Sequence, residues 1–166
     1  KPANWIPDRW TIYQFTQMFS INGYVSVPAF KYLMNSVIIS SISTVIAITI
    51  GMMGGYAFAR FNFKGKNKIF LSLMLARAVP GISLSLPLFI LFAKIGLINT
   101  SLGVIIVYVA MNVPFTIWLT DGFFRQIPKE MSEVARTDGC TRLQAFWNVE
   151  LPLAGPGIGA AAIFAF

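Results

Sequence analysis

Residues 33–58 read LMNSVIISSISTVIAITIGMMGGYAF, an apolar stretch without a single charged side chain. As an α-helix, these 26 residues rise roughly 39 Å, enough to cross a hydrocarbon core of about 30 Å with some tilt. Similar apolar stretches predict three further spans, at residues 69–93, 102–122 and 153–166. We therefore expect an all-α protein, a polytopic bundle of transmembrane helices. The sequence starts without methionine and stops inside an apolar stretch, so we expect a fragment that lacks flanking spans.

The composition also indicates a membrane protein. Hydrophobic residues make up 56% of the chain and charged residues only 11%, and the mean hydropathy is +0.69. A soluble domain is about a quarter charged, so these charges are too few to cover a water-facing surface. Cys140 is the single cysteine and histidine is absent, which excludes an internal disulfide and removes the usual metal ligands and general base. We expect no metal site and no catalytic residue.

The positive charges predict the orientation of the spans. Residues 59–68 carry four basic side chains and no acid, which places this loop in the cytoplasm. Residues 94–101 carry one lysine and fall outside, and the basic loop 123–152 returns to the cytoplasm. The segment 1–32 is then exterior, where its aromatic residues suit the membrane interface. The net charge of +7 is distributed between spans and forms no basic face, so we expect no nucleic-acid partner.

Small side chains recur every three or four residues along the first span. They predict one face that packs closely against another helix, because small residues let helix backbones approach each other in lipid. The residues are Ser36, Ser40, Ser43, Ala47, Gly51 and either Gly54 or Gly55.

Spans two and three contain residues that are unusual at membrane depth. Pro80 and Pro87 predict bends in span two, and broken helices are tolerated only beside protein or a water-filled cavity. This region is a candidate wall of a substrate pathway, with Arg77, Pro80 and Asn112 as candidate pathway residues. Arg77 fits a side chain that snorkels to water equally well, and for Asn112 we favour an interhelical hydrogen bond.

The loop 123–152 has the pattern of two short amphipathic helices. Pro128 suits a first helical position, and Gly139 suits the left-handed conformation that ends a helix. Thr141 and Gln144 have the spacing of a capping box that opens a second helix. We expect Leu143, Phe146 and Trp147 to line one face of this helix, which should end at Leu151 and Pro152.

These two helices need a surface that covers their apolar residues. A helix on a lipid surface has a mainly basic polar face. In this loop, acidic residues alternate with the basic ones, which favours a groove of a soluble protein over lipid. The acidic residues are Glu130, Glu133, Asp138 and Glu150.

The loop resembles the EAA loop of permease subunits of ABC importers. The resemblance rests on Glu133-Val-Ala135-Arg-Thr-Asp138-Gly139, followed by Leu151-Pro152 and Pro156. Tyr56-Ala-Phe-Ala-Arg60-Phe and Pro80 look like the carbohydrate-uptake branch, in particular the smaller permease subunit of the maltose-transporter type. The resemblance covers nearly the whole chain from Tyr32 onward. Val134 and Cys140 depart from the pattern but preserve size.

The resemblance implies a function and a set of partners. The fold would be that of the transmembrane domain of a type I ABC importer, in the cytoplasmic membrane of a bacterium or archaeon. The loop would couple sugar import to a dimer of ATPase subunits, which would bind the ATP and magnesium. A second, different permease chain and an extracytoplasmic sugar-binding protein would complete the transporter. The coupling residues would be Glu133, Val134, Ala135, Asp138, Gly139, Leu151 and Pro152.

Other interpretations stay open. Glu133 has the spacing to pair with Lys129 or Arg136 on the helix surface. An ion-coupled secondary transporter or channel would place an acid within a span, and Asp121 is the one acid near a span. The chain has no glycine-rich phosphate loop, so transport by an ABC system needs a separate ATPase.

Overall fold

The computed structural model describes residues 11–13, 16 and 29–166. The chain divides into two compact units, residues 1–38 and 39–166. Within the first unit, Thr16 donates a hydrogen bond to the carbonyl of Tyr13 (2.8 Å), and the helix α2 (Ala29–Arg60) begins. Most of the predicted exterior segment 1–32, including Trp5 and Trp10, lies outside the described residues.

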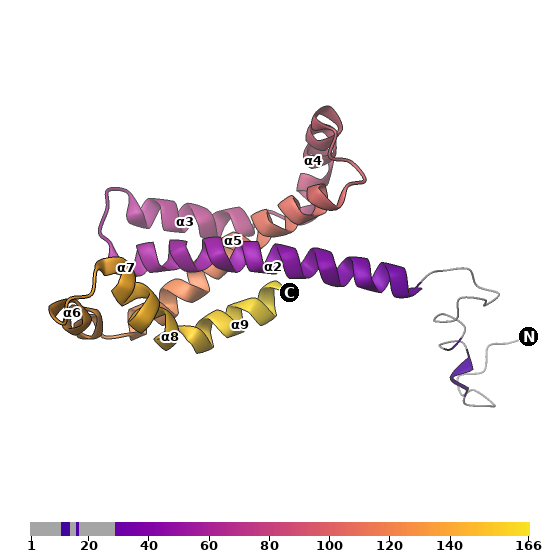
Figure 1. The fold of residues 1–166 in the computed structure, drawn as a ribbon. Coiled ribbons are helices and arrows are strands. Elements are labelled where there is room, and N and C mark those ends of the chain that lie inside the picture. The colour runs from indigo at the N-terminus through magenta and orange to yellow at the C-terminus, as the bar shows by residue number, and fades with distance from the viewer. Residues whose placement is uncertain (1–10, 14–15, 17–28) are drawn as a thin grey trace, which may run out of the picture. The chain divides into compact units, whose positions relative to one another are not determined.

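The second unit consists of helices, and the described residues contain no strand, which confirms the all-α prediction. Two helices, α2 and α5, are long and apolar enough to cross a membrane. Figure 1 labels most of the elements. After α2 they are α3 (Lys66–Arg77), α4 (Gly81–Ile95), α5 (Ser101–Gln126), α6 (Lys129–Thr137), α7 (Arg142–Ala145), the π-helix η1 (Phe146–Glu150), α8 (Leu151–Leu153) and α9 (Gly155–Ala165).

The small-residue face of α2 packs against α5, as predicted. Gly51 lies against the side chain of Thr116, and Gly55 lies against Thr120. The hydroxyl of Thr120 lies within hydrogen-bond distance of the carbonyl of Gly51 (3.0 Å) and of the carbonyl of Thr116 in its own helix (2.6 Å), so its one proton is shared across the close approach. Ser43 and Ala47, on the same face, are buried as well. The two long helices are therefore in backbone contact.

The expected single span 69–93 consists of two helices. α3 and α4 meet at an angle of 93° across a short break that ends at Pro80. Pro80 has an extended backbone (φ −59°, ψ 128°), and a proline also disfavours the helical conformation of the residue before it. Pro87, in contrast, lies inside α4, which continues through it. In Figure 1, α4 turns away from α3.

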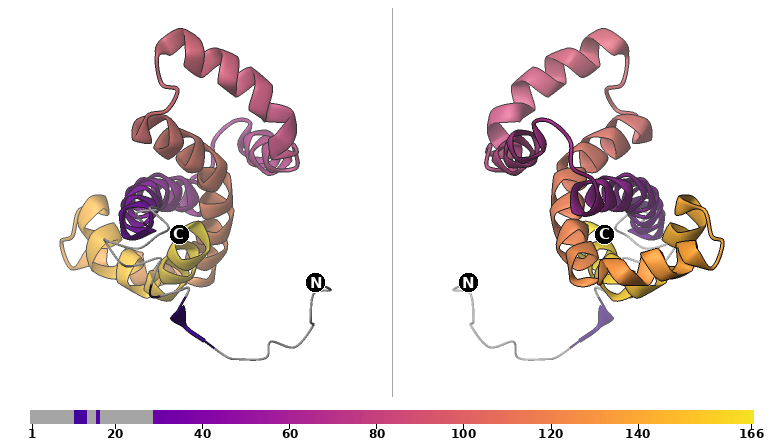
Figure 2. Two further views of the ribbon diagram at one scale, coloured as in Figure 1. Left: turned by 90° about the vertical axis from the view of Figure 1, so that its right-hand side faces the viewer. Right: turned by 90° about the vertical axis from the view of Figure 1, so that its left-hand side faces the viewer.

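α5 runs four residues beyond its predicted end at residue 122 and finishes at Gln126. Asp121 and Arg125, one turn apart, form an ion pair (2.8 Å), and Phe124 is fully buried, so the extra turn is stabilised by both contacts. α9 packs along α5, and both views of Figure 2 show this pair beside α2. The amide of Asn112 in α5 donates to the carbonyl of Ala165 in α9 (3.3 Å), which confirms the expected interhelical bond.

Candidate functional site

The loop after α5 forms a bent element that we call the elbow, residues 129–145, consisting of α6, a tight turn and α7. α6 begins at Lys129, one residue after the predicted start, because Pro128 takes the capping position with an extended backbone. Gly139 has the predicted left-handed conformation, φ 96°. Its N–H bonds to the carbonyl of Arg136 (3.2 Å), and the N–H of Cys140 bonds to that of Ala135 (3.0 Å). These two bonds form a Schellman motif, which fixes the end of α6.

A capping box fixes the start of α7, as predicted. The N–H of Gln144 donates to the hydroxyl of Thr141 (3.3 Å), and the N–H of Thr141 donates to the side-chain oxygen of Gln144 (2.8 Å). Both helices at the corner of the elbow are therefore terminated by their own backbone and side-chain hydrogen bonds, and the bend needs no partner to form.

The expected apolar face of the second helix is wrong in part. Phe146 is buried among aromatic side chains, but Leu143 is 67% exposed and Trp147 is 48% exposed. At roughly 100° per residue, Leu143 and Trp147 share one side of a helix, and Phe146 points to another. Met131 and Val134 on α6 are also exposed. The elbow thus presents large apolar side chains that nothing in the described part of the chain covers.

The chain does not end its helix at Leu151 and Pro152, which corrects the prediction. It widens into η1, where the N–H of Leu151 bonds to the carbonyl of Phe146, and then continues through Pro152 into α8. Pro152 lies directly after the π-turn, near the start of α8, where its missing N–H interrupts no established helical turn. Leu151 packs against the cluster formed by Phe124, Ile127, Phe146 and Ala154.

The structure separates the predicted coupling residues into two groups. Glu133, Val134, Asp138 and Gly139 are exposed on the elbow, and Ala135 beside them is half-buried. Leu151 and Pro152 lie beyond η1, at the base of the elbow.

Glu133 makes no ion pair with Lys129 or Arg136, although their spacing would allow one. Among the described residues, the ion pairs are Arg60 with Glu150 and Arg125 with Asp121. The side chains of Lys129, Glu133 and Arg136 instead border a cavity of about 300 Å³ between the elbow and the end of α2.

A buried ion pair at the base of the elbow escaped the sequence analysis. Arg60, the last residue of α2, places its Nε 2.6 Å from Oε2 of Glu150, and the two side chains are 9% and 2% exposed. Arg60 also donates to the carbonyl of Ile127 (3.1 Å), and the hydroxyl of Tyr56 donates to Oε1 of Glu150 (3.4 Å). We call these four residues the Arg60 anchor. Opposite charges at the ends of two apolar stretches were the signal available in the sequence.

A second link joins α2 to the end of α5. Arg125 pairs with Asp121 and donates to the carbonyl of Phe58 (3.3 Å). Asp121 is buried, and its Oδ2 is engaged in the ion pair with Arg125, while its Oδ1 has no hydrogen-bond partner among the described residues.

The candidate pathway residues lie around one stretch of α5. The guanidinium of Arg77, at the end of α3, stacks 4.1 Å from the ring centre of Phe115. Gly81, just after Pro80, faces the side chain of Met111. Asn112 lies between Met111 and Phe115 in α5. The break between α3 and α4, with Arg77 before it and Pro80 at its end, therefore lies next to the segment of α5 that contains Asn112.

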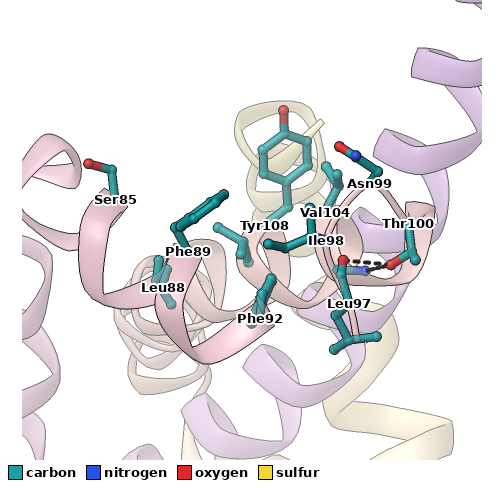
Figure 3. Close-up of a pocket in the computed structure, with 12 residues that line it drawn as sticks. Ser85, Leu88, Phe89, Phe92, Leu97, Ile98, Asn99, Thr100, Val104 and Tyr108 are labelled. Atoms are coloured by element: carbon teal, nitrogen blue, oxygen red, sulfur yellow. Dashed lines mark hydrogen bonds between the residues drawn. The ribbon is translucent and has the colours of Figure 1, made fainter. Parts of the chain in front are cut away.

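A separate apolar hollow of about 310 Å³ lies where α4 and α5 meet. Figure 3 shows Phe89 and Phe92 of α4 facing Tyr108 and Val104 of α5, with the connecting loop at one side. Thr100 orders this loop by donating to the carbonyl of Leu97 and accepting from the N–H of Gly103. No charged side chain lines the hollow, and the three candidate pathway residues lie outside it.

Residues 47–166 match the family model described as "Binding-protein-dependent transport system inner membrane component". The chain belongs to this family. The matched region contains the elbow, the Arg60 anchor and the contact between α2 and α5. This permease is a multi-pass protein of the inner membrane.

Several curated relatives of the permease are named for the transport of sugars or sugar derivatives. It is 35% identical over 161 residues to the diacetylchitobiose uptake system permease protein NgcG of Streptomyces coelicolor, which covers 97% of the chain and 52% of the relative. It is 42% identical over 134 residues to the trehalose transport system permease protein SugB of Mycobacterium tuberculosis, covering 81% and 49%. It is 32% identical over 166 residues to the sulfoquinovosyl glycerol transport system permease protein SmoH of Agrobacterium fabrum, covering 100% and 56%. The permease therefore spans about half the length of these relatives.

Proposed function

We propose that the permease forms part of the transmembrane pathway of an ABC importer and that the elbow docks into a separate ATPase subunit. One observation carries this proposal. The elbow is fixed internally by a Schellman motif and a capping box, yet Met131, Val134 and Leu143 on the elbow, and Trp147 just after it, are all at least 46% exposed. A rigid element with uncovered apolar side chains suits a preformed groove on a partner, because docking then costs little ordering entropy.

In this proposal the residues of the elbow have different tasks. Val134 and the exposed aromatic and aliphatic side chains fill the groove, and Glu133 and Asp138 make polar contacts at its edge. Gly139 holds the corner, and Ala135 keeps it narrow. Leu151 and Pro152 connect the docked element to α9. The ATPase subunits bind ATP and magnesium, and their closure moves the elbow and with it the spans.

We further propose that the cargo is a sugar or oligosaccharide. The relatives described above are named for diacetylchitobiose, trehalose and sulfoquinovosyl glycerol, which are all glycosides. An extracytoplasmic sugar-binding protein would deliver the cargo, and a second permease chain would complete the pathway. Arg77, Pro80 and Asn112 are proposed to line it, since a broken helix at membrane depth has to lie beside protein or a water-filled cavity.

The docking proposal is tested with Gly139→Asp and Glu133→Arg in the full-length permease, assembled with its partners. Both variants should reach the membrane in normal amount, while co-purification of the ATPase subunit falls at least tenfold and ATP-driven uptake is lost. A side chain at Gly139 disfavours the left-handed turn, and an arginine in place of Glu133 reverses the charge at the edge of the docking surface.

Gly65→Asp is the matched control. Gly65 also has a left-handed backbone, φ 82°, with no atom within 4 Å of an added Cβ, but it lies outside the elbow. It should retain ATPase association. If both elbow variants keep full uptake and full association, the docking role is wrong. Uptake without any ATPase subunit would instead favour an ion-coupled transporter.

A further inference from the structure

We propose that Arg60 and Glu150 are positioning residues that join the base of the elbow to α2, so that the two move as one rigid lever. The inference rests on the proposed docking of the elbow, because it concerns how a push on the elbow reaches the membrane spans. Neither residue belongs to the docking surface, and both lie at the opposite end of η1 and α7 from the corner at Gly139.

The first argument is connectivity. The guanidinium of Arg60 holds three segments together, since it is itself part of α2 and bonds to Glu150 of η1 and to the carbonyl of Ile127 after α5. Both carboxylate oxygens of Glu150 are occupied, one by Arg60 and one by the Tyr56 hydroxyl. Four groups from three segments thus meet at one point. A single contact would let η1 rotate relative to α2, but several bonds in different directions do not.

The second argument is the nature of the bonds. An ion pair excluded from water resists separation, because each charge would otherwise remain buried without a partner. Hydrogen bonds also have preferred directions, which fix the orientation of the groups that they join. The surrounding contacts are aromatic: Tyr56 packs against Phe146 and Phe124, with ring centres 4.6 and 5.4 Å apart. The anchor therefore adds directional bonds to a packed contact between η1 and α2.

The third argument is where the motion goes next. One to three turns before Arg60 in α2, Gly51 and Gly55 lie in close contact with α5, and the Thr120 hydroxyl of α5 is within hydrogen-bond distance of the carbonyl of Gly51. Arg125 ties the end of α5 to the carbonyl of Phe58. A displacement of α2 at Arg60 is thus passed directly to α5, and the elbow, α2 and α5 form one continuous body.

The test measures a distance inside the assembled, full-length transporter. Spin labels are attached at Met53→Cys on α2 and Thr137→Cys on the elbow, both at exposed positions, with Cys140→Ser in the background. Distances are recorded without nucleotide and after trapping with ATP and vanadate. The wild-type anchor should give the same mean distance in both states.

The variant Arg60→Met with Glu150→Leu removes both charges and keeps the volume, so the fold should survive. Here trapping should shift the mean distance by more than the width of its distribution, while the ATPase subunit still co-purifies. Arg60→Lys retains the charge, but its single ammonium group cannot bond to Glu150 and the carbonyl of Ile127 as the guanidinium does. It should give a smaller shift in the distance, and it replaces the double variant in this test if that variant fails to fold.

Each outcome decides the question. A shift on trapping with the wild-type anchor refutes the rigid lever, and so does an unchanged distance in the double variant or, if that variant does not fold, in Arg60→Lys. A purely structural role would lower the thermal stability of the variants without making the distance depend on nucleotide. If no ATPase subunit co-purifies with the wild-type permease, the docking proposal fails and the rigid-lever proposal fails with it. If the complex hydrolyses ATP but the distance between the spin labels changes on trapping with the wild-type anchor, only the rigid-lever proposal is refuted.

Discussion

The two halves of the second unit are held together in different ways. Around the elbow, α2, α5 and η1 share fully buried side chains, close backbone contacts and a buried ion pair. α3 and α4, in contrast, contain no buried residue, and α3 contacts its neighbours through the cation–π contact of Arg77 with α5 and through the rings of Phe70 and Phe58 with α2. The first region thus has a buried interior beneath the exposed elbow, whereas α3 and α4 have none.

The sequence explains this difference. α2 places small residues along one face, so the two helices approach until the side-chain hydroxyl of Thr120 reaches the carbonyl of Gly51. α3 and α4 carry mainly large aliphatic and aromatic residues without such a face. Large side chains on all sides suit lipid or a second helical surface, and they do not fix one close-packed partner within the chain. The rigid region is also the one that carries the proposed coupling element.

The largest loss of stability is expected when one side of the Arg60 anchor is removed. Arg60→Ala leaves Glu150 buried without a counter-charge, which should cost about 3–5 kcal/mol of stability. The measurement is the free energy of unfolding of the full-length permease in mixed micelles. Lys64→Ala, which removes an exposed cation from the loop that follows α2, should change this free energy by less than about 0.5 kcal/mol. Equal effects of the two substitutions would mean that the anchor is solvated and contributes nothing special.

A smaller effect is expected from the glycine face of α2. In Gly55→Ala, the new Cβ would collide with the Thr120 hydroxyl and lie 2.7 Å from the backbone nitrogen of Asp121, which cannot move aside. We expect a loss of roughly 1–3 kcal/mol from overpacking, measured in the same unfolding assay.

Gly122→Ala is the control for this substitution. It adds a methyl group to α5 where no atom lies within 4 Å, so it should be neutral or stabilising, since alanine favours helix. If Gly55→Ala is tolerated equally well, the two helices have room to separate, and the rigid region is less rigid than its contacts suggest.

Local signals in the sequence predicted the rigid region best. The small-residue face of α2, the left-handed Gly139 and the capping box at Thr141 are each defined within a few residues, and the structure confirms all three. The bond from Asn112 was also predicted, although its partner Ala165 could not be named from the sequence.

The failures have a common physical cause. Arg60 and Glu150 are 90 residues apart, so no periodic pattern connects them. The π-turn at η1 places Phe146 in the cluster with Phe124, Ile127 and Ala154, which lie far from it in the sequence or beyond the turn. The turn between α3 and α4 is 93°, and at its start Arg77 contacts Phe115 of α5. These features involve contacts between residues that are distant in the sequence, which local patterns do not describe.

The smallest expected effect concerns the loosely held half. Arg77→Ala should destabilise the permease by about 0.5–1 kcal/mol, because the guanidinium is exposed and an exposed cation–π contact contributes no more than this. A double-mutant cycle with Phe115→Leu isolates the contact, and the coupling energy should account for most of that loss. Phe115 also stacks with Trp118, so Phe115→Leu alone should cost more than Arg77→Ala. A coupling energy above about 2 kcal/mol would require a desolvated contact, and α3 would then be anchored to α5 as firmly as α2 is, which would erase the contrast between the two halves.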